Sequence, residues 1–547
     1  MIRLRAVRLP TDPLTTALHD LTVEAGRIVA VQPAGRAGQD GRPTIDGGGR
    51  LAMPGFLDAH AHVEGALFTD EVQHALLRQG VTSVVVGNDG VSFAPAPGPT
   101  GQWASDYFAA INGSHPAGPQ TEVADLLAGY QGAVRVNVAM LVPHGNLRHA
   151  VVGGADRPAA PAELDQMRQL LRAGLDQGAC GMSTGLEYQP GGFADLDELT
   201  ALTGELAARG LPHVSHMRGY ELDAVPALGE LAEIARGSGV ATHVSHLHGP
   251  ATPILAALAA TRAEGLDITF DSYPYLRGAS ILSMIAMPDW IPLAEPAVAL
   301  TQLRREEVQQ RLLREHLPGL ADVWPRVTMA YVPGEHAWAE GHSLLQVAER
   351  LGVPPARAVL DLLVSTDLRA GCTFAQPPSN SEAAVRALLR DTRHLAASDA
   401  IYAGSRPHPR GWGTFARFLA EHVRRHGDWT WAQAAWHLSG AAAQRFRLAD
   451  RGSLRVGSAA DIVLVDPDTV QDNATYADPR RLASGIDDVL VNGRLVLAGG
   501  ELTDERAGAP VRPQQGRAQV PPEHRSLLPA GSPGRHREAQ IGGHDHG

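Results

Sequence analysis

The chain of 547 residues contains no lysine, so all 47 residues counted as lysine plus arginine are arginines. This absence excludes three kinds of functional group: a Schiff-base lysine, a phosphate-binding P-loop lysine and a carboxylated lysine that bridges two metal ions. Any mechanism proposed for this protein must therefore work without an amine side chain.

Cysteine, long apolar runs and positive charge are also scarce. The only cysteines are Cys180 and Cys372, which give no disulfide framework. No run of about 18 apolar residues predicts a transmembrane helix, and residues 1–10 lack the pattern of a signal peptide. The net charge of −12 argues against nucleic acid as a partner. We expect a cytoplasmic protein with a small-molecule substrate and neither a nucleic-acid nor a membrane partner; the oligomeric state is left open.

The order of the predicted elements indicates an α/β protein. Short β segments occur in residues 1–50 and 448–507, and we expect them to pair into one small β-sandwich domain. Residues 51–447 alternate short apolar runs with amphipathic helical patterns, which is typical of βαβ units and a parallel sheet. Eight such units predict a (β/α)₈ barrel of the TIM type. The expected strands are 52–58, 82–87, 135–141, 179–184, 211–215, 241–245, 267–271 and 394–398.

Two segments depart from the simple barrel pattern. Residues 278–335, between the seventh and eighth strands, are too long for an ordinary loop, and they form either a lid over the barrel mouth or an inert insertion. Residues 508–547 are rich in Pro, Arg, Gln and His and are expected to be disordered. An open doubly wound sheet is the alternative fold, but no Gly-x-Gly-x-x-Gly motif follows the first strand.

Residues of the kind that bind metals stand at the ends of five predicted strands. Active sites of such barrels lie at the carboxyl ends of the strands, and the two histidines of His-x-His share one face of an extended segment. A single histidine at a strand end is usually structural, but four histidines with two aspartates indicate a divalent metal site. These residues are His60 and His62 after the first strand, Asp89 after the second, His216 after the fifth, His246 after the sixth and Asp399 after the eighth.

These residues lie within longer segments that extend over nearly the whole chain, among them "MPGFLDAHAH", "GVTSVVVGNDGVSFAP", "GACGMSTGLEYQPGGFA", "SHMRGYE", "VSHLHG", "DITFDSYPY", "HPRGWGTFARFL" and "DRGSLRVGSAADIVLVDPDTV". The segments resemble the N-acyl-D-amino-acid deacylase (D-aminoacylase) family of the amidohydrolase superfamily. The resemblance implies a (β/α)₈ barrel, a small β-sandwich from both termini, one or two zinc ions and a mobile segment over the site.

One departure from that family concerns the metal. The family usually has cysteine at the position of Asp89, where it holds the tightly bound zinc with two later histidines. The resemblance assigns this role here to Asp89, His216 and His246; in the alternative, Glu187 is the ligand and Asp89 only accepts a hydrogen bond behind it. An oxygen ligand in place of sulfur weakens the preference for Zn²⁺ and allows Mn²⁺ or Fe²⁺.

The other departure concerns the substrate. The family has a lysine after the sixth-strand histidine, where it contacts the substrate carboxylate, and His248 stands there instead. Tyr188 and Arg410 match further carboxylate-contacting positions, and the planar guanidinium of Arg410 suits a carboxylate. A hydroxyl residue expected after "YPY" is not clearly retained in "LRGASIL", and Arg277 is a candidate for a compensating cation.

Asp399 is the predicted catalytic residue. A cation at this site makes hydroxide available near pH 7, and Asp399 is expected to take a proton from the attacking water and deliver it to the departing amine. Asp58 is expected to orient a neighbour rather than to react, and His144 is a candidate for the pocket wall.

The leading functional prediction is hydrolysis of the amide bond of an N-acyl-D-amino acid or a related N-acyl compound. A cyclic-amide hydrolase or a deaminase is the alternative, because the same superfamily scaffold supports those reactions. A non-catalytic scaffold is disfavoured, since all four histidines and Asp399 are present. The sequence does not predict the acyl group, the side chain or the stereochemistry of the substrate.

Overall fold

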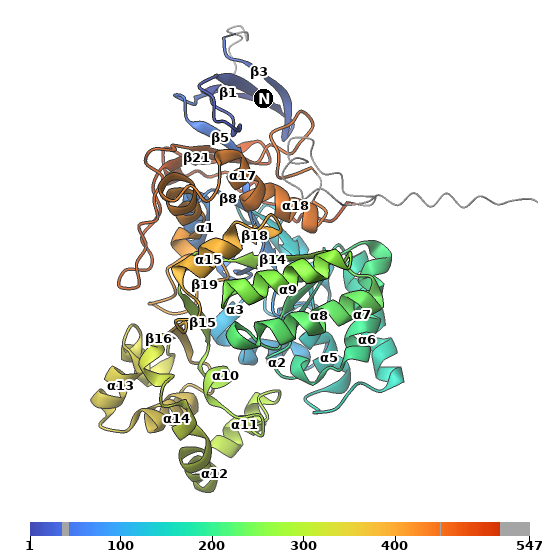
Figure 1. Cartoon of the computed structure of the whole chain (residues 1–547), viewed down its shortest axis with the longest axis vertical. Coiled ribbons are helices and arrows are strands. Elements are labelled where there is room, and N and C mark those ends of the chain that lie inside the picture. The colour runs from blue at the N-terminus through green and yellow to red at the C-terminus, as the bar shows by residue number, and fades with distance from the viewer. Residues whose placement is uncertain (36–42, 449, 515–547) are drawn as a thin grey trace, which may run out of the picture.

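The computed structural model describes residues 1–35, 43–448 and 450–514. The chain forms three parts along its long axis, with a small β domain at one end, a barrel in the middle and an inserted helical unit at the other end (Figure 1). Among the described residues, no helix is both long enough and apolar enough to cross a membrane.

Eight parallel strands form the barrel, as the sequence predicts. They are hydrogen-bonded in the orders β6–β8–β9 and β10–β11–β12–β13–β14–β18. Only Leu141 separates β9 from β10, and its N–H donates to the carbonyl of Val86 (2.9 Å), so β9 and β10 form one bent strand. The N–H of Ala59 donates to the carbonyl of Ala396 (3.3 Å), which brings the last strand back to the first. The bounds are β6 Phe56–Asp58, β8 Val81–Val86, β9 Asn137–Met140, β10 Val142–Pro143, β11 Met182–Gly185, β12 His213–His216, β13 Thr242–Val244, β14 Ile268–Ser272 and β18 His394–Ala396.

The barrel strands are apolar because both of their faces are covered. All six residues of β8, "VTSVVV", are buried, as expected for a parallel strand with side chains inside and helices outside. The helices carry ordinary end signals: α7 follows Asp195, whose side chain accepts from the N–H of Glu198 (2.9 Å), and stops at the left-handed Gly210. The main covering helices are α1 Asp70–Arg78, α5 His144–Val152, α6 Pro161–Asp176, α7 Leu196–Arg209, α8 Ala224–Ser238, α9 Ala251–Ala263, α15 Glu382–Leu389 and α16 Arg410–Arg417.

Gly55 marks the passage from the small β domain into the barrel. The predicted strand 52–58 is in fact two strands, because β5 (Leu51–Pro54) pairs with β20 (Ile462–Val465) in the small domain whereas β6 pairs with β8 in the barrel. A side chain at Gly55 would collide with Thr82 of β8, so this crossing requires glycine. Each of the other seven predicted strands overlaps a barrel strand.

The small β domain consists of two sheets from opposite ends of the chain. One has the order β3–β2–β1–β4 and the other β23–β22–β21–β20–β5. Buried apolar residues of both sheets, including Leu4, Leu21 and Ile462, form a common cluster. The remaining bounds are β1 Ile2–Val7, β2 His19–Glu24, β3 Arg27–Pro33, β4 Thr44–Asp46, β21 Ile486–Val491, β22 Arg494–Ala498 and β23 Glu501–Leu502.

The inserted unit between β14 and β18 extends beyond the predicted 278–335. Its core is a three-stranded antiparallel sheet, β15–β17–β16, so the unit continues as far as β17. An apolar cluster that includes Leu303, Trp324 and Val359 fills it and continues into the barrel loops through Trp103 and Tyr188. The bounds are β15 Arg277–Ile281, α10 Leu282–Ala286, α11 Pro296–Leu303, α12 Glu306–Arg311, β16 Val327–Tyr331, α13 Leu344–Leu351, α14 Pro355–Ser365 and β17 Gly371–Ala375.

The first part of the segment expected to be disordered, 508–547, lies against the barrel. The N–H of Val138 in β9 donates to the carbonyl of Ala509 (3.0 Å), and the N–H of Val511 donates to the carbonyl of Val138 (2.8 Å). The N–H of Gln514 donates to the carbonyl of Arg447 (3.0 Å). Residues 515–547 lie outside the described residues.

Candidate metal centre and cavity

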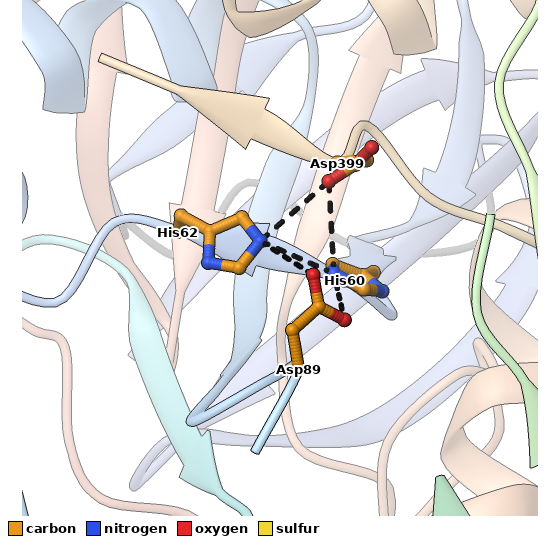
Figure 2. Close-up of side chains that lie close together, drawn as sticks. All are labelled: His60, His62, Asp89 and Asp399. Carbon is orange, nitrogen blue, oxygen red and sulfur yellow. Dashed lines mark hydrogen bonds and ion pairs between the residues drawn. The ribbon is translucent and has the colours of Figure 1, made fainter. Parts of the chain in front are cut away.

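Four of the residues predicted to bind metal meet at the carboxyl end of the barrel (Figure 2). The Nε2 atoms of His60 and His62 are 3.3 Å apart. Asp89 places Oδ1 3.4 Å from Nε2 of His60 and Oδ2 3.4 Å from Nε2 of His62. Oδ1 of Asp399 is 3.6 Å from each of the same two nitrogens. Two imidazoles and two carboxylates therefore face one small volume.

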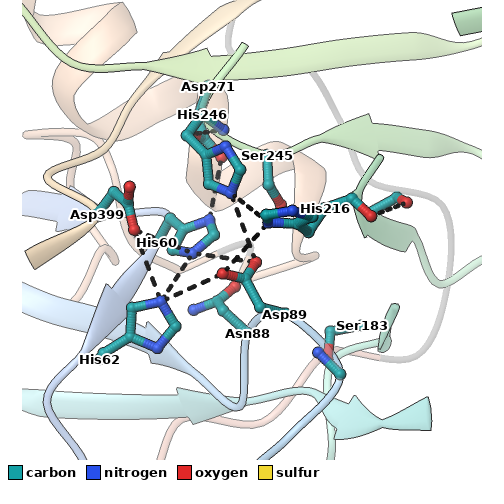
Figure 3. A network of polar contacts seen from close by, with 12 residues as sticks. His60, His62, Asn88, Asp89, Ser183, His216, Ser245, His246, Asp271 and Asp399 are labelled. Atoms are coloured by element: carbon teal, nitrogen blue, oxygen red, sulfur yellow. Dashed lines mark hydrogen bonds and ion pairs between the residues drawn. The ribbon is translucent and has the colours of Figure 1, made fainter. Parts of the chain in front are cut away.

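The second set of metal-type residues shares Asp89 with the first (Figure 3). Nδ1 of His216 is 3.0 Å from Nε2 of His246. These nitrogens lie 3.7 Å from Oδ2 and Oδ1 of Asp89, respectively. The two carboxylate oxygens of Asp89 thus stand between the two pairs of histidines.

The chemistry of these side chains fits one or two divalent cations. All six are buried, and burial alone lowers the pKa of His62 and of His216. Hydrogen bonds to Asp399 and Asp89 outweigh burial at His62, and those to Asp89 and Glu187 do so at His216, so that each pKa rises to about 9. A cation bound among these side chains would neutralise the same carboxylates that raise the two pKa values. Imidazole and carboxylate are also the ligands that Zn²⁺ and related ions prefer.

Glu187, the alternative ligand, points at the outer side of His216. Its Oε2 atom lies 2.8 Å from Nε2 of His216, on the ring nitrogen that faces away from Asp89. This contact fixes the tautomer that leaves Nδ1 of His216 as the donor atom toward the shared carboxylate. The geometry brings Asp89, not Glu187, into both sets of donors.

Two buried carboxylates fix the loops that carry the cluster. Asp58 accepts hydrogen bonds from the N–H of His60 (3.3 Å) and from the N–H of Ser398 (2.9 Å), which agrees with its predicted orienting role. Oε1 of Glu64 accepts from the N–H of Gly87 (3.1 Å) and the hydroxyl of Ser92 (2.9 Å), on either side of Asp89. The loops after the first, second and eighth strands are thereby tied together.

Asn112 and Asp271 orient individual histidines and were not predicted from the sequence. Oδ1 of Asn112 is 3.0 Å from Nδ1 of His62, which leaves Nε2 facing the cluster. Asp271 accepts from the N–H of His246 (2.7 Å), and its Oδ2 lies 3.7 Å from Nδ1 of His60. Asp271 therefore contacts one histidine of each set from behind. Asp271 belongs to "DITFDSY", on a different strand from His246 and His60. The contact could therefore not be predicted before the barrel was known to close.

The contacts of Asp271 predict a loss of metal affinity in the Asp271→Asn variant. An asparagine amide retains only one acceptor oxygen and cannot serve His246 and His60 as the carboxylate does. Loss of such an outer partner typically weakens metal binding roughly 10- to 100-fold. Titration with a competing chelator measures the change. The matched control is Asp267→Asn, just before the same strand, whose carboxylate pairs with Arg445 and Arg393. Equal metal affinity of both variants would contradict the assignment.

A cavity of about 280 Å³ opens onto the cluster. His62, Asp89, His216, His246 and Asp399 contribute to its wall. Side chains from the segments after β8, β11, β12, β13, β14 and β18 and from the inserted unit complete it. These are Ile111, Glu187, Tyr188, Arg218, Tyr220, Glu221, Asp223, His248, Tyr273, Ala279, Ser280, Met284, Phe374 and Ile401.

The predicted substrate-binding residues lie at two depths. Tyr188 and His248 line the cavity, and so does Ser280 of the segment "LRGASIL". Arg410 is fully buried and does not line the cavity; its Nη1 is 2.8 Å from Oδ2 of Asp399 and its guanidinium lies over the ring of Tyr273.

Two weaker candidates lie away from the cavity wall. Arg277 packs over the ring of Tyr476, with 4.6 Å between the guanidinium carbon and the ring centroid. His144 is buried behind the cavity, with Nε2 2.8 Å from Oε1 of Glu198. Neither residue contacts the space in which a substrate would lie.

Comparison with known families identifies the class to which this site belongs. The model of the amidohydrolase family matches residues 43–497, and the chain belongs to that family. Together with the shared cluster of histidines and aspartates, this makes the protein a metal-dependent amidohydrolase.

Individual relatives are similar over nearly their whole length. N-acyl-D-glutamate deacylase from Alcaligenes xylosoxydans xylosoxydans is 34% identical over 541 residues, covering 96% of this chain and 94% of the relative. D-aminoacylase from the same organism is 31% identical over 496 residues, covering 89% and 92%. A crystal structure of N-acyl-D-glutamate deacylase from Bordetella bronchiseptica, complexed with zinc and a phosphonate that mimics the tetrahedral intermediate, has a TM-score of 0.78 and 31% identity. That likeness covers 93% of this chain and 99% of the other.

Proposed function

We propose that this protein hydrolyses the amide bond of N-acyl-D-amino acids at the cluster of four histidines and two aspartates. The observation that carries the proposal is the position of Asp89 in both sets of metal-type donors, at the wall of a cavity that Asp399 also faces. The relatives named N-acyl-D-glutamate deacylase and D-aminoacylase support this substrate class.

We assign one cation to Asp89, His216 and His246, and a second to His60, His62, Asp89 and Asp399. Zn²⁺ is the proposed metal, because these ligands suit it and the related crystal structure contains zinc. Mn²⁺ and Fe²⁺ are the alternatives, since the shared ligand is an oxygen donor. A bound cation of this kind supplies Lewis acidity, which lowers the pKa of a nearby water and polarises the amide carbonyl.

Asp399 is assigned the proton transfers. Burial raises the pKa of its carboxyl, but the Arg410 guanidinium and His62 outweigh burial and lower the pKa to about 2. The carboxylate is therefore ionised at neutral pH, which is the form that can accept a proton from an attacking water and then return it to the departing amine.

Arg410 and Tyr188 are assigned to the α-carboxylate of the substrate. The guanidinium of Arg410 is fully buried and pairs with Asp399 through Nη1 (2.8 Å to Oδ2). A guanidinium has five N–H donors, so we assign those that Asp399 does not take to the substrate carboxylate. Tyr188 and Ser280 add hydroxyl groups on the cavity wall, and His248 completes the predicted set.

An assay of metal-loaded protein tests this function directly. We expect release of free amine from N-acetyl-D-methionine and at least about 100-fold slower release from its L enantiomer, because a fixed carboxylate contact presents only one enantiomer's amide to Asp399. Hydrolysis of a hydantoin but of no N-acyl-amino acid would favour the cyclic-amide alternative and contradict the proposal. Apoprotein prepared with a chelator is the control and should be inactive until the metal is restored.

A further inference from the structure

The cavity wall beyond the metal-type cluster carries an excess of negative charge. Glu187, Glu221 and Asp223 line it, whereas Arg218 is the only arginine among the lining residues that the structure describes. The chain has no lysine, so no ammonium group can reach this wall from another element. The balance of charge on the wall therefore depends on whether Arg218 is free.

Arg218 is already engaged by the protein. Its Nε donates to the carboxylate of Glu230 at 3.2 Å. Its Nη1 donates to the carbonyl of Gly192, and its Nη2 donates to the carbonyl of Ala194 at 3.1 Å and to Glu230 at 3.2 Å. With one carboxylate and two carbonyls bound, this guanidinium has little capacity left for a substrate anion.

Glu221 is held at the wall by an unusual backbone conformation. Its φ of +57° lies in the left-handed region, where a residue other than glycine costs conformational free energy. Its N–H reaches the carbonyl of His248 (3.4 Å), and a Cβ at Gly249 would meet its Cα at 2.9 Å. Within the described residues, its half-buried carboxylate makes no hydrogen bond or ion pair. Burial raises the pKa of this carboxyl, and Arg326, which makes no ion pair with it among the described residues, offsets that rise only in part. The fold therefore keeps at the cavity a carboxylate that no cation binds directly.

His248 adds no strong hydrogen-bond donor beside Glu221. Its Nδ1 lies 2.8 Å from the carbonyl of His246, which occupies one ring nitrogen with a local contact. Its ring stacks on Tyr220 with parallel planes and centroids 4.9 Å apart. These two contacts hold the imidazole against the wall, with one ring nitrogen already engaged by the backbone.

We propose that this wall selects substrates that carry an ammonium or guanidinium group and that Glu221 is the residue that makes the selection. The inference rests on the proposed function, since the cation is a second group on an N-acyl-D-amino acid. The α-carboxylate is still bound on the Arg410 side. A carboxylate side chain would instead meet Glu187 and Glu221 without a free cation to bind it.

Four substrates test the selection with metal-loaded, full-length protein. They are Nα-acetyl-D-lysine, N-glycyl-D-methionine, N-acetyl-D-methionine and Nα-acetyl-D-glutamate. The first carries its ammonium on the side chain and the second on the acyl group, so the faster of the two locates the cation. We expect the better cationic substrate to exceed N-acetyl-D-methionine in kcat/KM by roughly tenfold, because it gains a hydrogen bond to a charged group. We expect the glutamate derivative to be the slowest, because its side-chain carboxylate would be left unpaired.

Variants then test the residue. In Glu221→Gln, the ratio of kcat/KM for the better cationic substrate to that for N-acetyl-D-methionine should fall by about tenfold. In Glu221→Lys, the glutamate derivative should become a better substrate than either cationic one. Glu349→Gln, an exposed acid on α13, is the matched control and should keep the wild-type ratio.

The outcomes separate this inference from the proposed function. If N-acetyl-D-methionine is hydrolysed but the glutamate derivative is as good a substrate as the cationic ones, the inference is overturned and the proposed function stands. An unchanged ratio in Glu221→Gln overturns the role of Glu221. Hydrolysis of none of the four substrates overturns the proposed function and the inference with it.

Discussion

Replacing Asp399 with asparagine is expected to reduce kcat by roughly a thousandfold, as for the loss of a general base and acid. The amide has the same shape but cannot take a proton from water or return one to the amine. Oδ1 of Asp399 faces His60 and His62 at 3.6 Å, so the same change also removes one donor of that set. Steady-state kinetics with N-acetyl-D-methionine measures the loss.

Metal content distinguishes this loss of chemistry from a loss of structure. Asp89, His216 and His246 form a set without Asp399, and we expect the variant to retain the cation assigned to them. Elemental analysis of the dialysed variant measures this occupancy. The matched control is Asp504→Asn, an exposed aspartate outside the barrel. Turnover of Asp399→Asn close to that of the control would refute the assigned role.

Replacing Asp89 with alanine should have a still broader effect, because both sets of donors lose the same carboxylate. We expect neither cation to be retained after dialysis and turnover to fall to background. His216 and His246 then lose the carboxylate of their set, and His60 and His62 keep only Asp399, which disfavours a divalent ion in either set. Metal analysis and thermal unfolding with and without added Zn²⁺ report the change, since a ligand bound only by the folded state raises its stability.

Asp89→Cys is the informative partner of that variant. A thiolate restores an anionic ligand but offers one sulfur atom in place of two oxygens. We expect recovery of zinc binding with His216 and His246 and a weaker response to Mn²⁺ than in the wild-type protein. Retention of both cations by Asp89→Ala would mean that the shared carboxylate is not a ligand.

The barrel could be predicted from the sequence because its strands are short, apolar runs with helical patterns between them. The boundary at Gly55 could not, because β5 and β6 are equally apolar and nothing local says that they belong to different sheets. The inserted unit was underestimated for a similar reason. β17 lies 90 residues after the end of β15 in the sequence and yet pairs with it, and such long-range pairing leaves no local signal.

The metal-type residues were predictable because each one lies at or shortly after the carboxyl end of a barrel strand. The residues that support them were not, because Asn112, Asp271 and Glu221 acquire meaning only from what they face. The site of Arg410 illustrates the limit: its guanidinium was expected at the substrate, and the structure places it behind Asp399. Its direct role toward a carboxylate stays a prediction, while its effect on the pKa of Asp399 follows from the geometry.

The last described residues lie at the amino-terminal end of the barrel strands. Gln514 is held by Arg447, and Arg447 in turn donates to the carbonyls of Arg209 and Gly210, which precede β12 at its amino end. The cavity opens at the opposite, carboxyl end of the same strand. A label attached to the side chain at position 514 would therefore stand clear of the entrance and leave substrate access unchanged.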